Sequence, residues 1–357
     1  MKKSRWRPVV VTVLLVAGVV FVPPLVMRDR DPAPAAPPEI VLNPDDVDAQ
    51  FARYFPDQPW AMDLVETQSL WGWSRGGPYG WENEDGDKGG VVVADGRRRT
   101  LEVADPELTV WLLGGSTAFG FGQRDDHTIA SEMVRIASER GVPIRVENLG
   151  VSGYVNWQEP QVFQDLLASG ERPDVAVFLD GANDTSLGLE RERFGLLDPE
   201  ENHVQTMTDE QRDELAAAAE QQGHRSSNDL DLAVQLAAAQ YRRGVELARD
   251  LGRAHDVQVA HYWQPQLYTV PLDAPLVEDA LEQWQITPER HAAVGEVVDR
   301  IAERSGVDPV DLTDIFDDVD GPIFYDTSHT NEEGARLTAL AIMDDLWATI
   351  LVERSDA

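Results

Sequence analysis

The sequence contains no cysteine, so the fold has neither disulfide bonds nor thiolate metal ligands. Lysine is nearly absent too, and the only lysines are Lys2, Lys3 and Lys88. Basic residues number 30 against 64 acidic ones, and the net charge is −34. A chain this acidic repels the phosphate backbone of nucleic acids. We therefore expect no nucleic-acid partner and interpret the acidity as a contribution to solubility.

Long hydrophobic runs are also scarce, and one near the start of the chain stands out. Residues 9–22 are apolar except for Thr12, and they follow a basic segment, residues 2–7. With the apolar residues just beyond, the run approaches the roughly 20 residues that cross a bilayer as a helix. The basic flank should stay in the cytoplasm. We expect residues 1–30 to be a single-pass membrane anchor with the rest of the chain outside; a cleaved signal peptide is the alternative.

Two segments separate this run from the main domain. Residues 31–46 are rich in proline and alanine, which predicts a semi-extended spacer. Residues 47–106 form an extension rich in glycine and tryptophan, including Trp60, Trp71, Trp73 and Trp81. Tryptophan clusters can stack on sugars, but burial of a small subdomain against its neighbour is favoured, because tryptophan buries a large area wherever it lies.

Strand and helix patterns alternate in the domain formed by residues 107–357. Short apolar runs predict buried strands near residues 108–113, 144–149, 174–179, 257–262 and 310–312. Helical spacing predicts helices over residues 126–140, 157–168, 288–304 and 331–352. This alternation indicates right-handed crossovers and a parallel sheet with helices on both faces.

A helical insertion interrupts this rhythm at about residues 190–253. Its two helical stretches, near residues 208–222 and 230–251, are rich in alanine and charge. We interpret them as a helical hairpin that is either a solvated excursion, the favoured reading, or a cover over one side of the site.

The first predicted strand ends in Gly114 and Gly115, followed by Ser116. Glycine allows the backbone to turn sharply here and to present Ser116 at the edge of the sheet where ligands bind. Ser116 is therefore a candidate nucleophile. A phosphate-binding loop is the alternative interpretation of these glycines. It is disfavoured, because the sequence has no Gly-x-x-x-x-Gly-Lys-Ser/Thr or Gly-x-Gly-x-x-Gly pattern.

A serine nucleophile needs a base, a group that orients the base, and donors for the developing oxyanion. His329 is the leading base, and Asp326 lies three residues before it. Thr330 and Glu333 match a capping box, so the histidine should sit at a rigid helix entrance.

Candidate oxyanion donors lie at the ends of the other predicted strands. Gly153 has no side chain, so its N–H can approach a bound oxygen closely, and Asn183 offers a side-chain N–H. The N–H of Ser116 is the third candidate donor. A metal site at Asp125, Asp126 and His127 is disfavoured, because adjacent residues at a helix entrance point apart, and an exposed cap is the simpler reading.

Four segments together resemble, in order and spacing, the blocks of the SGNH/GDSL hydrolases. They are Gly114-Gly115-Ser116-Thr117, Asn148-Leu149-Gly150-Val151-Ser152-Gly153, Gly181-Ala182-Asn183-Asp184 and Asp326-Thr327-Ser328-His329. The resemblance implies a flavodoxin-like three-layer α/β/α sandwich with a mostly five-stranded parallel sheet. It also implies Ser116 as nucleophile, His329 as general base and Asp326 as its orienter. The implied oxyanion hole consists of the Ser116 and Gly153 N–H groups and the Asn183 side chain.

The chain departs from the family's named motif on both sides of the serine. Gly115 stands where the motif has aspartate, and Thr117 stands where it has leucine. The missing aspartate removes a hydrogen-bonding group near the nucleophile loop. Asp184 is the residue expected to brace that loop instead.

These observations predict a membrane-anchored extracytoplasmic serine esterase that works through an acyl-enzyme, without cofactor or metal. The expected partner is an ester substrate, an acylated glycan or lipid, with O-acetyl groups of cell-surface glycans as one choice. An O-acyltransferase of envelope polysaccharide is one alternative, since it would use the same acyl-enzyme. A catalytically silent glycan-binding or scaffold protein is the other, although such a protein would not need a Ser, Asn and Asp-x-x-His set.

Overall fold

The structure is a computed structural model that describes residue 64 and residues 73–75, 81–194, 230–274, 276–277, 281 and 286–351. The expected membrane anchor, the spacer and the first helical stretch of the insertion lie outside these residues. Among the helices that the structure describes, none has both the length and the apolar character needed to cross a membrane.

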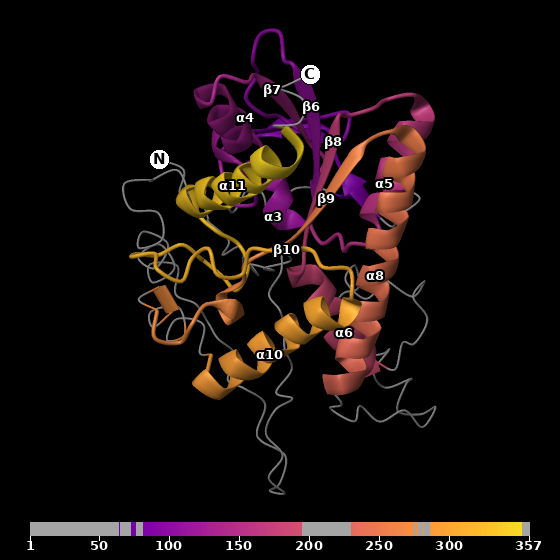
Figure 1. The fold of residues 1–357 in the computed structure, drawn as a ribbon. Helices are drawn as coiled ribbons and strands as arrows, with labels where there is room; N and C mark the ends of the chain where they lie inside the picture. Colours follow the sequence, from indigo (N-terminus) through magenta and orange to yellow (C-terminus); the bar gives the residue numbers. More distant parts are fainter. Residues whose placement is uncertain are drawn as a thin grey trace, which may run out of the picture.

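The centre of the described chain is a mixed sheet of eight strands (Figure 1). Five of them are parallel: β6 (Leu108–Gly114), β7 (Ile144–Asn148), β8 (Val175–Asp180), β9 (Gln258–Trp263) and β10 (Val310–Asp311). Their spatial order is β10-β9-β8-β6-β7, which is the flavodoxin-like order. The parallel sheet predicted from the alternating pattern is thus confirmed.

Three short antiparallel strands widen this sheet beyond β7. They are β5 (Arg97–Arg98), β4 (Val91–Ala94) and β3 (Gly86–Lys88), and β5 pairs with β7 at Arg98 and Asn148. A separate two-stranded sheet is formed by β1 (Trp73–Arg75) and β2 (Trp81–Asn83). The prediction of a five-stranded sheet was therefore too narrow, because strands from the N-terminal extension are added to one edge.

Helices cover both faces of the sheet (Figure 1). One face carries α4 (Ile129–Glu139) and α11 (Glu332–Leu346), and the other carries α5 (Glu159–Ser169) and α8 (Leu230–His255). Alternate residues of β6 enter the two cores: Val110 packs with α4 and α11, whereas Trp111 packs with α5. This accounts for the unbroken apolar run of β6, since both of its faces are buried.

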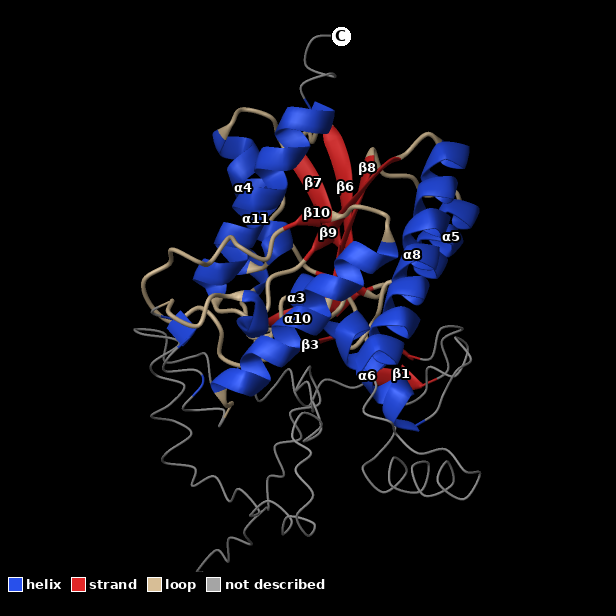
Figure 2. Ribbon diagram, turned by 60° about the horizontal axis from the view of Figure 1, so that its bottom comes forward, coloured by secondary structure: helices blue, strands red, loops and turns tan. Residues whose placement is uncertain are grey.

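Helix α8 is part of the crossover from β8 to β9. Its buried residues recur at helical spacing and include Ala233, Ala237, Tyr241, Val245 and Ala248. This stripe packs against α5, α6 (Ala182–Phe194) and α10 (Pro288–Ser305), as Figure 2 shows. The favoured reading of residues 230–251 as a solvated excursion was wrong, because a continuous apolar stripe makes the helix part of a packed layer.

The remaining elements are short. They are α3 (Ser116–Phe119), the 3₁₀ turns η1 (Asp125–His127) and η3 (Leu267–Thr269), and a π-helical turn, η4 (Trp347–Leu351), after α11. Gly114 of β6 pairs with Leu179 of β8, so α3 and α6 begin next to each other at the carboxyl edge of the sheet. This edge is the switch point of the strand order, where open α/β sheets bind ligands.

Candidate active site

Two glycines allow the chain to turn from β6 directly into α3. Gly114 has φ +153°, and a Cβ there would lie 2.6 Å from the carbonyl oxygen of Leu179. A Cβ on Gly115 would collide with Nδ2 of Asn183. A side chain at position 115 would therefore require the Asn183 amide to move from the place it takes here. Ser116 follows as the first residue of α3.

Ser116, His329 and Asp326 form a continuous hydrogen-bonded chain. Ser116 Oγ lies 2.7 Å from Nε2 of His329, and Nδ1 of His329 lies 2.5 Å from Oδ2 of Asp326. All three residues are buried. In this arrangement the imidazole can accept the hydroxyl proton on Nε2 while Nδ1–H stays bonded to the carboxylate.

The Asp326 carboxylate is fixed by the loop that carries it. Its Oδ1 accepts the backbone N–H groups of Ser328 at 2.8 Å and His329 at 2.6 Å. The N–H of Tyr325 donates to the carbonyl of His329 at 3.1 Å and closes the loop. Oδ2 is thereby directed toward the imidazole, so the orientation of His329 does not depend on a mobile side chain.

The entrance to α11 differs from the predicted one. The N-cap is Asn331, whose side chain accepts the N–H of Gly334 at 3.0 Å. Thr330 forms an isolated β-bridge with Phe324, which keeps its backbone extended and delays the helix until Glu332. The predicted capping box of Thr330 and Glu333 was therefore wrong.

The candidate oxyanion donors lie on segments that adjoin α3. Nδ2 of Asn183, in the first turn of α6, donates one hydrogen to the carbonyl of Tyr154 at 2.7 Å. An amide nitrogen carries two hydrogens, so the second can serve a substrate oxygen. Gly153 adopts φ +82° in the loop after β7, and within that loop a Cβ on Gly150 would overlap the backbone of α3. The loop therefore runs directly beside α3, the helix that begins with Ser116.

A buried acidic cluster lies behind these donors and was not predicted. Its carboxyl groups are those of Glu159, Asp180 and Asp184. Burial raises the pKa of Asp180 to about 6, and burial together with the charge of Asp180 raises the pKa of Glu159 and Asp184. The sequence signal is the position of Asp180, which ends a strand that is otherwise entirely apolar.

Asn156 connects the acidic cluster to the loop that carries Gly153. Its N–H donates to Oδ1 of Asp184 at 3.2 Å, and its Nδ2 donates to Oδ2 of Asp180 at 2.8 Å. Oδ2 of Asp184 also accepts the N–H of Gly181, at 3.3 Å. Asp184 was expected to brace the loop of Ser116. In these contacts it instead holds together the two segments that carry the candidate donors Gly153 and Asn183.

Asp125, Asp126 and His127, which were considered as metal ligands, lie in η1, after α3. Asp125 is buried, and its carboxylate accepts from Arg98 and from the N–H of Val92, so its reading as an exposed cap was wrong. His127 instead bonds through Nδ1 to Glu132 at 2.9 Å. Over the described part of the chain, no group of three histidine, cysteine or acidic residues is arranged to hold a metal ion.

Serine and histidine bonded at the switch point of an α/β sheet are the arrangement expected of a hydrolase with a serine nucleophile. Residues 112–337 match the model of the GDSL-like lipase/acylhydrolase family. The chain belongs to this family and is a carboxylic ester hydrolase.

Several solved structures are similar to the chain at low sequence identity. The acetyl xylan esterase AlAXEase is 14% identical, with 68% of this chain and 100% of that chain covered and a TM-score of 0.38. An acetyl xylan esterase from Geobacillus stearothermophilus is 17% identical, with 68% and 95% covered and a TM-score of 0.38. A lipase/acylhydrolase from Enterococcus faecalis is 14% identical, with 67% and 95% covered and a TM-score of 0.36. No curated protein matches the chain.

Proposed function

We propose that the protein hydrolyses esters through a covalent acyl-enzyme on Ser116. The serine Oγ attacks the ester carbonyl carbon while its proton passes to Nε2 of His329. The imidazolium then gives this proton to the leaving alcohol as the ester C–O bond breaks. In the second half, His329 takes a proton from water, the hydroxide oxygen attacks the acyl carbon, and the proton returns to Ser116 as the acid leaves.

The observation that supports this proposal most strongly is the bonded chain from Ser116 through His329 to Asp326. A carboxylate that accepts Nδ1–H fixes the tautomer in which Nε2 can act as a base, and it stabilises the imidazolium that forms. A buried serine with only a structural role would not need an imidazole nitrogen 2.7 Å from its oxygen.

We assign the oxyanion hole to the N–H groups of Ser116 and Gly153 and to Nδ2 of Asn183. The contact of Asn183 with Tyr154 and the tight fit against Gly115 support this assignment, because they hold the amide beside the nucleophile. A donor that is already oriented costs no reorganisation when the carbonyl oxygen becomes negative.

The location and the substrate class complete the proposal. The apolar run at residues 9–22, behind a basic segment, favours a membrane anchor with the catalytic domain outside the cytoplasm. For an enzyme in that location, O-acyl groups of surface glycans are accessible esters. We therefore propose an O-acetyl esterase of cell-surface glycans.

The test uses the full-length protein with p-nitrophenyl acetate and a serine-reactive fluorophosphonate. Wild type should release p-nitrophenol and gain the mass of one phosphonyl group on Ser116, and Ser116→Ala should do neither. Ser138→Ala is the matched control, since Ser138 lies on α4 and bonds to the carbonyl of Val134. It should behave as wild type.

Two outcomes would contradict the proposal. Turnover by Ser116→Ala equal to that of wild type would remove Ser116 from the mechanism. Absence of both turnover and labelling in wild type would favour a catalytically silent protein. With an acetylated glycan as donor, release of free acetate indicates a hydrolase, whereas transfer of acetyl to a second glycan indicates an acyltransferase.

A further inference from the structure

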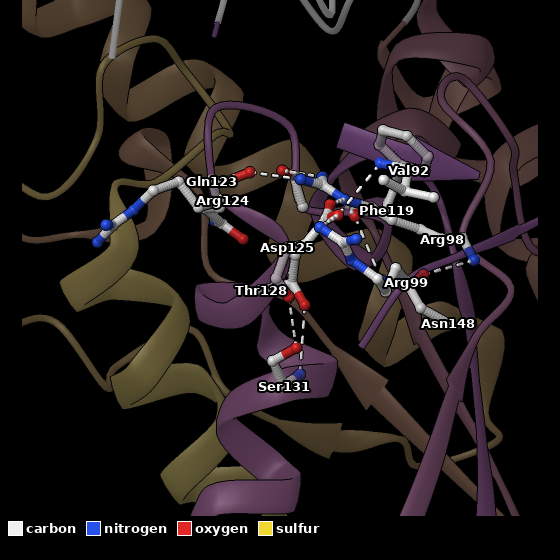
Figure 3. Close-up of polar contacts among 12 residues, drawn as sticks. Val92, Arg98, Arg99, Phe119, Gln123, Arg124, Asp125, Thr128, Ser131 and Asn148 are labelled. Carbon is white, nitrogen blue, oxygen red and sulfur yellow. Dashed lines mark hydrogen bonds and ion pairs between the residues drawn. The ribbon is translucent and has the colours of Figure 1, made fainter. Parts of the chain in front are cut away.

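A buried arginine from the N-terminal extension lies at the end of the nucleophile helix (Figure 3). Arg98, in β5, donates from Nη1 to the carbonyls of Phe119 at 3.0 Å and Gly120 at 2.6 Å. Its Nη2 donates to the carbonyl of Gln123, and its Nε donates to Asp125 Oδ1 at 3.1 Å. One guanidinium therefore binds four acceptors between the last residue of α3 and the first residue of η1.

Burying this charged side chain costs free energy, so its contacts should provide something that an apolar side chain would not. Burial lowers the pKa of Arg98 to about 10, although the neighbouring Asp125 carboxylate opposes this effect. A buried ion pair is often no more stabilising than an apolar pair of similar size. What an apolar residue cannot supply is a rigid planar fork of donors that holds three backbone carbonyls in one arrangement.

The other side of the same loop supports His329. The ring of Phe121 lies 5.0 Å from the imidazole, centroid to centroid. The Phe121 carbonyl accepts the hydroxyl of Tyr325 at 2.7 Å, and Nε2 of Gln123 donates to the carbonyl of Thr330 at 3.0 Å. Residues 119–125 thus lie between Arg98 on one side and the loop of the catalytic base on the other.

Further contacts from the extension reach the same loop. Val91 and Val93 of β4 pack against Phe119, and the N–H of Val92 donates to Asp125 Oδ2 at 3.1 Å. In β2, Nδ2 of Asn83 donates to the carbonyl of Gly150 at 2.9 Å, on the loop that leads to Gly153. The extension residues that make these contacts, Asn83, Val91, Val92 and Val93, precede the matched family segment, which begins at residue 112.

We propose that Arg98 is a positioning residue for ester hydrolysis. By holding the carbonyls of Phe119, Gly120 and Gln123, it fixes the segment between α3 and the residues that contact the His329 loop, and so keeps Ser116 Oγ and His329 Nε2 in bonding geometry. The N-terminal extension therefore completes the active site of this protein. The inference rests on the proposed roles of Ser116 and His329.

Arg97 provides a matched control on the same strand. Its side chain pairs with Glu147 and Glu171 at the surface, and it differs from Arg98 chiefly in the direction in which it leaves β5. Arg97→Met and Arg98→Met each remove one positive charge from adjacent positions. A difference between the two variants therefore reports the contacts of Arg98 and not the change in net charge.

The kinetic test measures kcat and KM for p-nitrophenyl acetate and the rate of fluorophosphonate labelling in the full-length protein. Arg98→Met should lower kcat and the labelling rate about a hundredfold with KM unchanged, because small displacements of reacting groups have effects of that order. Arg98→Lys should lose less, since lysine keeps the charge but not the fork. Arg97→Met should match wild type. Wild-type kcat in Arg98→Met would overturn the proposal.

A double variant separates positioning from general stability. In Arg98→Met the buried Asp125 carboxylate keeps Arg99 and the N–H of Val92 as partners but loses Arg98. Arg98→Met/Asp125→Asn also removes the charge of this partly deprived carboxylate, so Tm should recover in part relative to Arg98→Met. The kcat should stay low, because the carbonyls of Phe119, Gly120 and Gln123 still lack their donor. Recovery of kcat together with Tm would show a merely structural role and overturn the proposal.

Hydrogen–deuterium exchange tests the inference even if wild type does not turn over p-nitrophenyl acetate. Arg98→Met should speed exchange in peptides that cover residues 116–125 and 325–331, and Arg97→Met should not. Unchanged exchange in Arg98→Met would overturn the positioning role. Failure of wild type to turn over or to be labelled would overturn the proposed function, which is a separate outcome.

Discussion

Replacing Asp180 with asparagine should change how the stability of the protein depends on pH. The pKa of this buried carboxyl is raised from its ordinary 3.8 to about 6, mainly by burial. The folded state therefore holds a proton that the unfolded state releases between pH 4 and pH 6. Because the folded state then binds more protons, the free energy of unfolding falls as pH rises through this window.

The size of the effect follows from the two pKa values. The difference corresponds to about 3 kcal/mol of stability, fully present below about pH 4 and lost above about pH 6. Asparagine has nearly the same shape, and its Oδ1 can accept the bond from Asn156 Nδ2, but it carries no charge at any pH. Relative to wild type, Asp180→Asn should thus gain about 3 kcal/mol between pH 4 and pH 7 from this group. The gain should exceed this figure, because the variant also removes the charge that helps to raise the pKa of Glu159 and Asp184.

Urea unfolding at a series of pH values measures this difference. Asp87→Asn is the control, because Asp87 is exposed on β3 and its replacement changes the net charge equally. Its stability relative to wild type should vary little across the same range. A difference between Asp180→Asn and wild type that does not change with pH would refute the argument that burial of this carboxyl opposes its ionisation.

Two further predictions concern the donors beside the nucleophile. Asn183→Ala should lower kcat for p-nitrophenyl acetate about 10²- to 10³-fold with little change in KM, because an oxyanion donor acts mainly in the transition state. An unchanged kcat would show that Asn183 is not part of the oxyanion hole. Gly115→Asp, which restores the aspartate of the family's named motif, should also lower kcat, because its Cβ displaces the Asn183 amide. Gly115→Ala should lower it as well, since the collision begins at Cβ, and wild-type activity in both variants would contradict this reasoning.

Hydrophobic patterns within short segments were sufficient to predict the parallel strands of the sheet, β6 to β10. The strands β6 and β8 each contain an unbroken apolar run, residues 110–113 and 175–179, because both of their faces are covered, and such runs are visible in the sequence. The added strands β3, β4 and β5 are two to four residues long, too short to show a period. They form because the edge of β7 offers hydrogen bonds, which is a property of the assembled sheet.

The candidate site, too, could be predicted from the sequence only in part. Ser116, Asp326 and His329 stand in recognisable motifs, and the structure brings them into contact. Arg98 lies between two other arginines and has no local feature that distinguishes it from them. Only the packing of β5 beside the loop after α3 buries it, so its contacts with Phe119 and Asp125 could not be inferred from the sequence.

Ser116 and His329, the proposed nucleophile and base, are 213 positions apart in the chain. Between them lie β7, β8, β9 and β10, which must all take their places before the serine oxygen can meet the imidazole. A contact of such long range forms late and slowly during folding. A nascent polypeptide that has been synthesised only as far as β9 therefore possesses its serine but no partner to activate it, and the onset of activity marks the end of assembly.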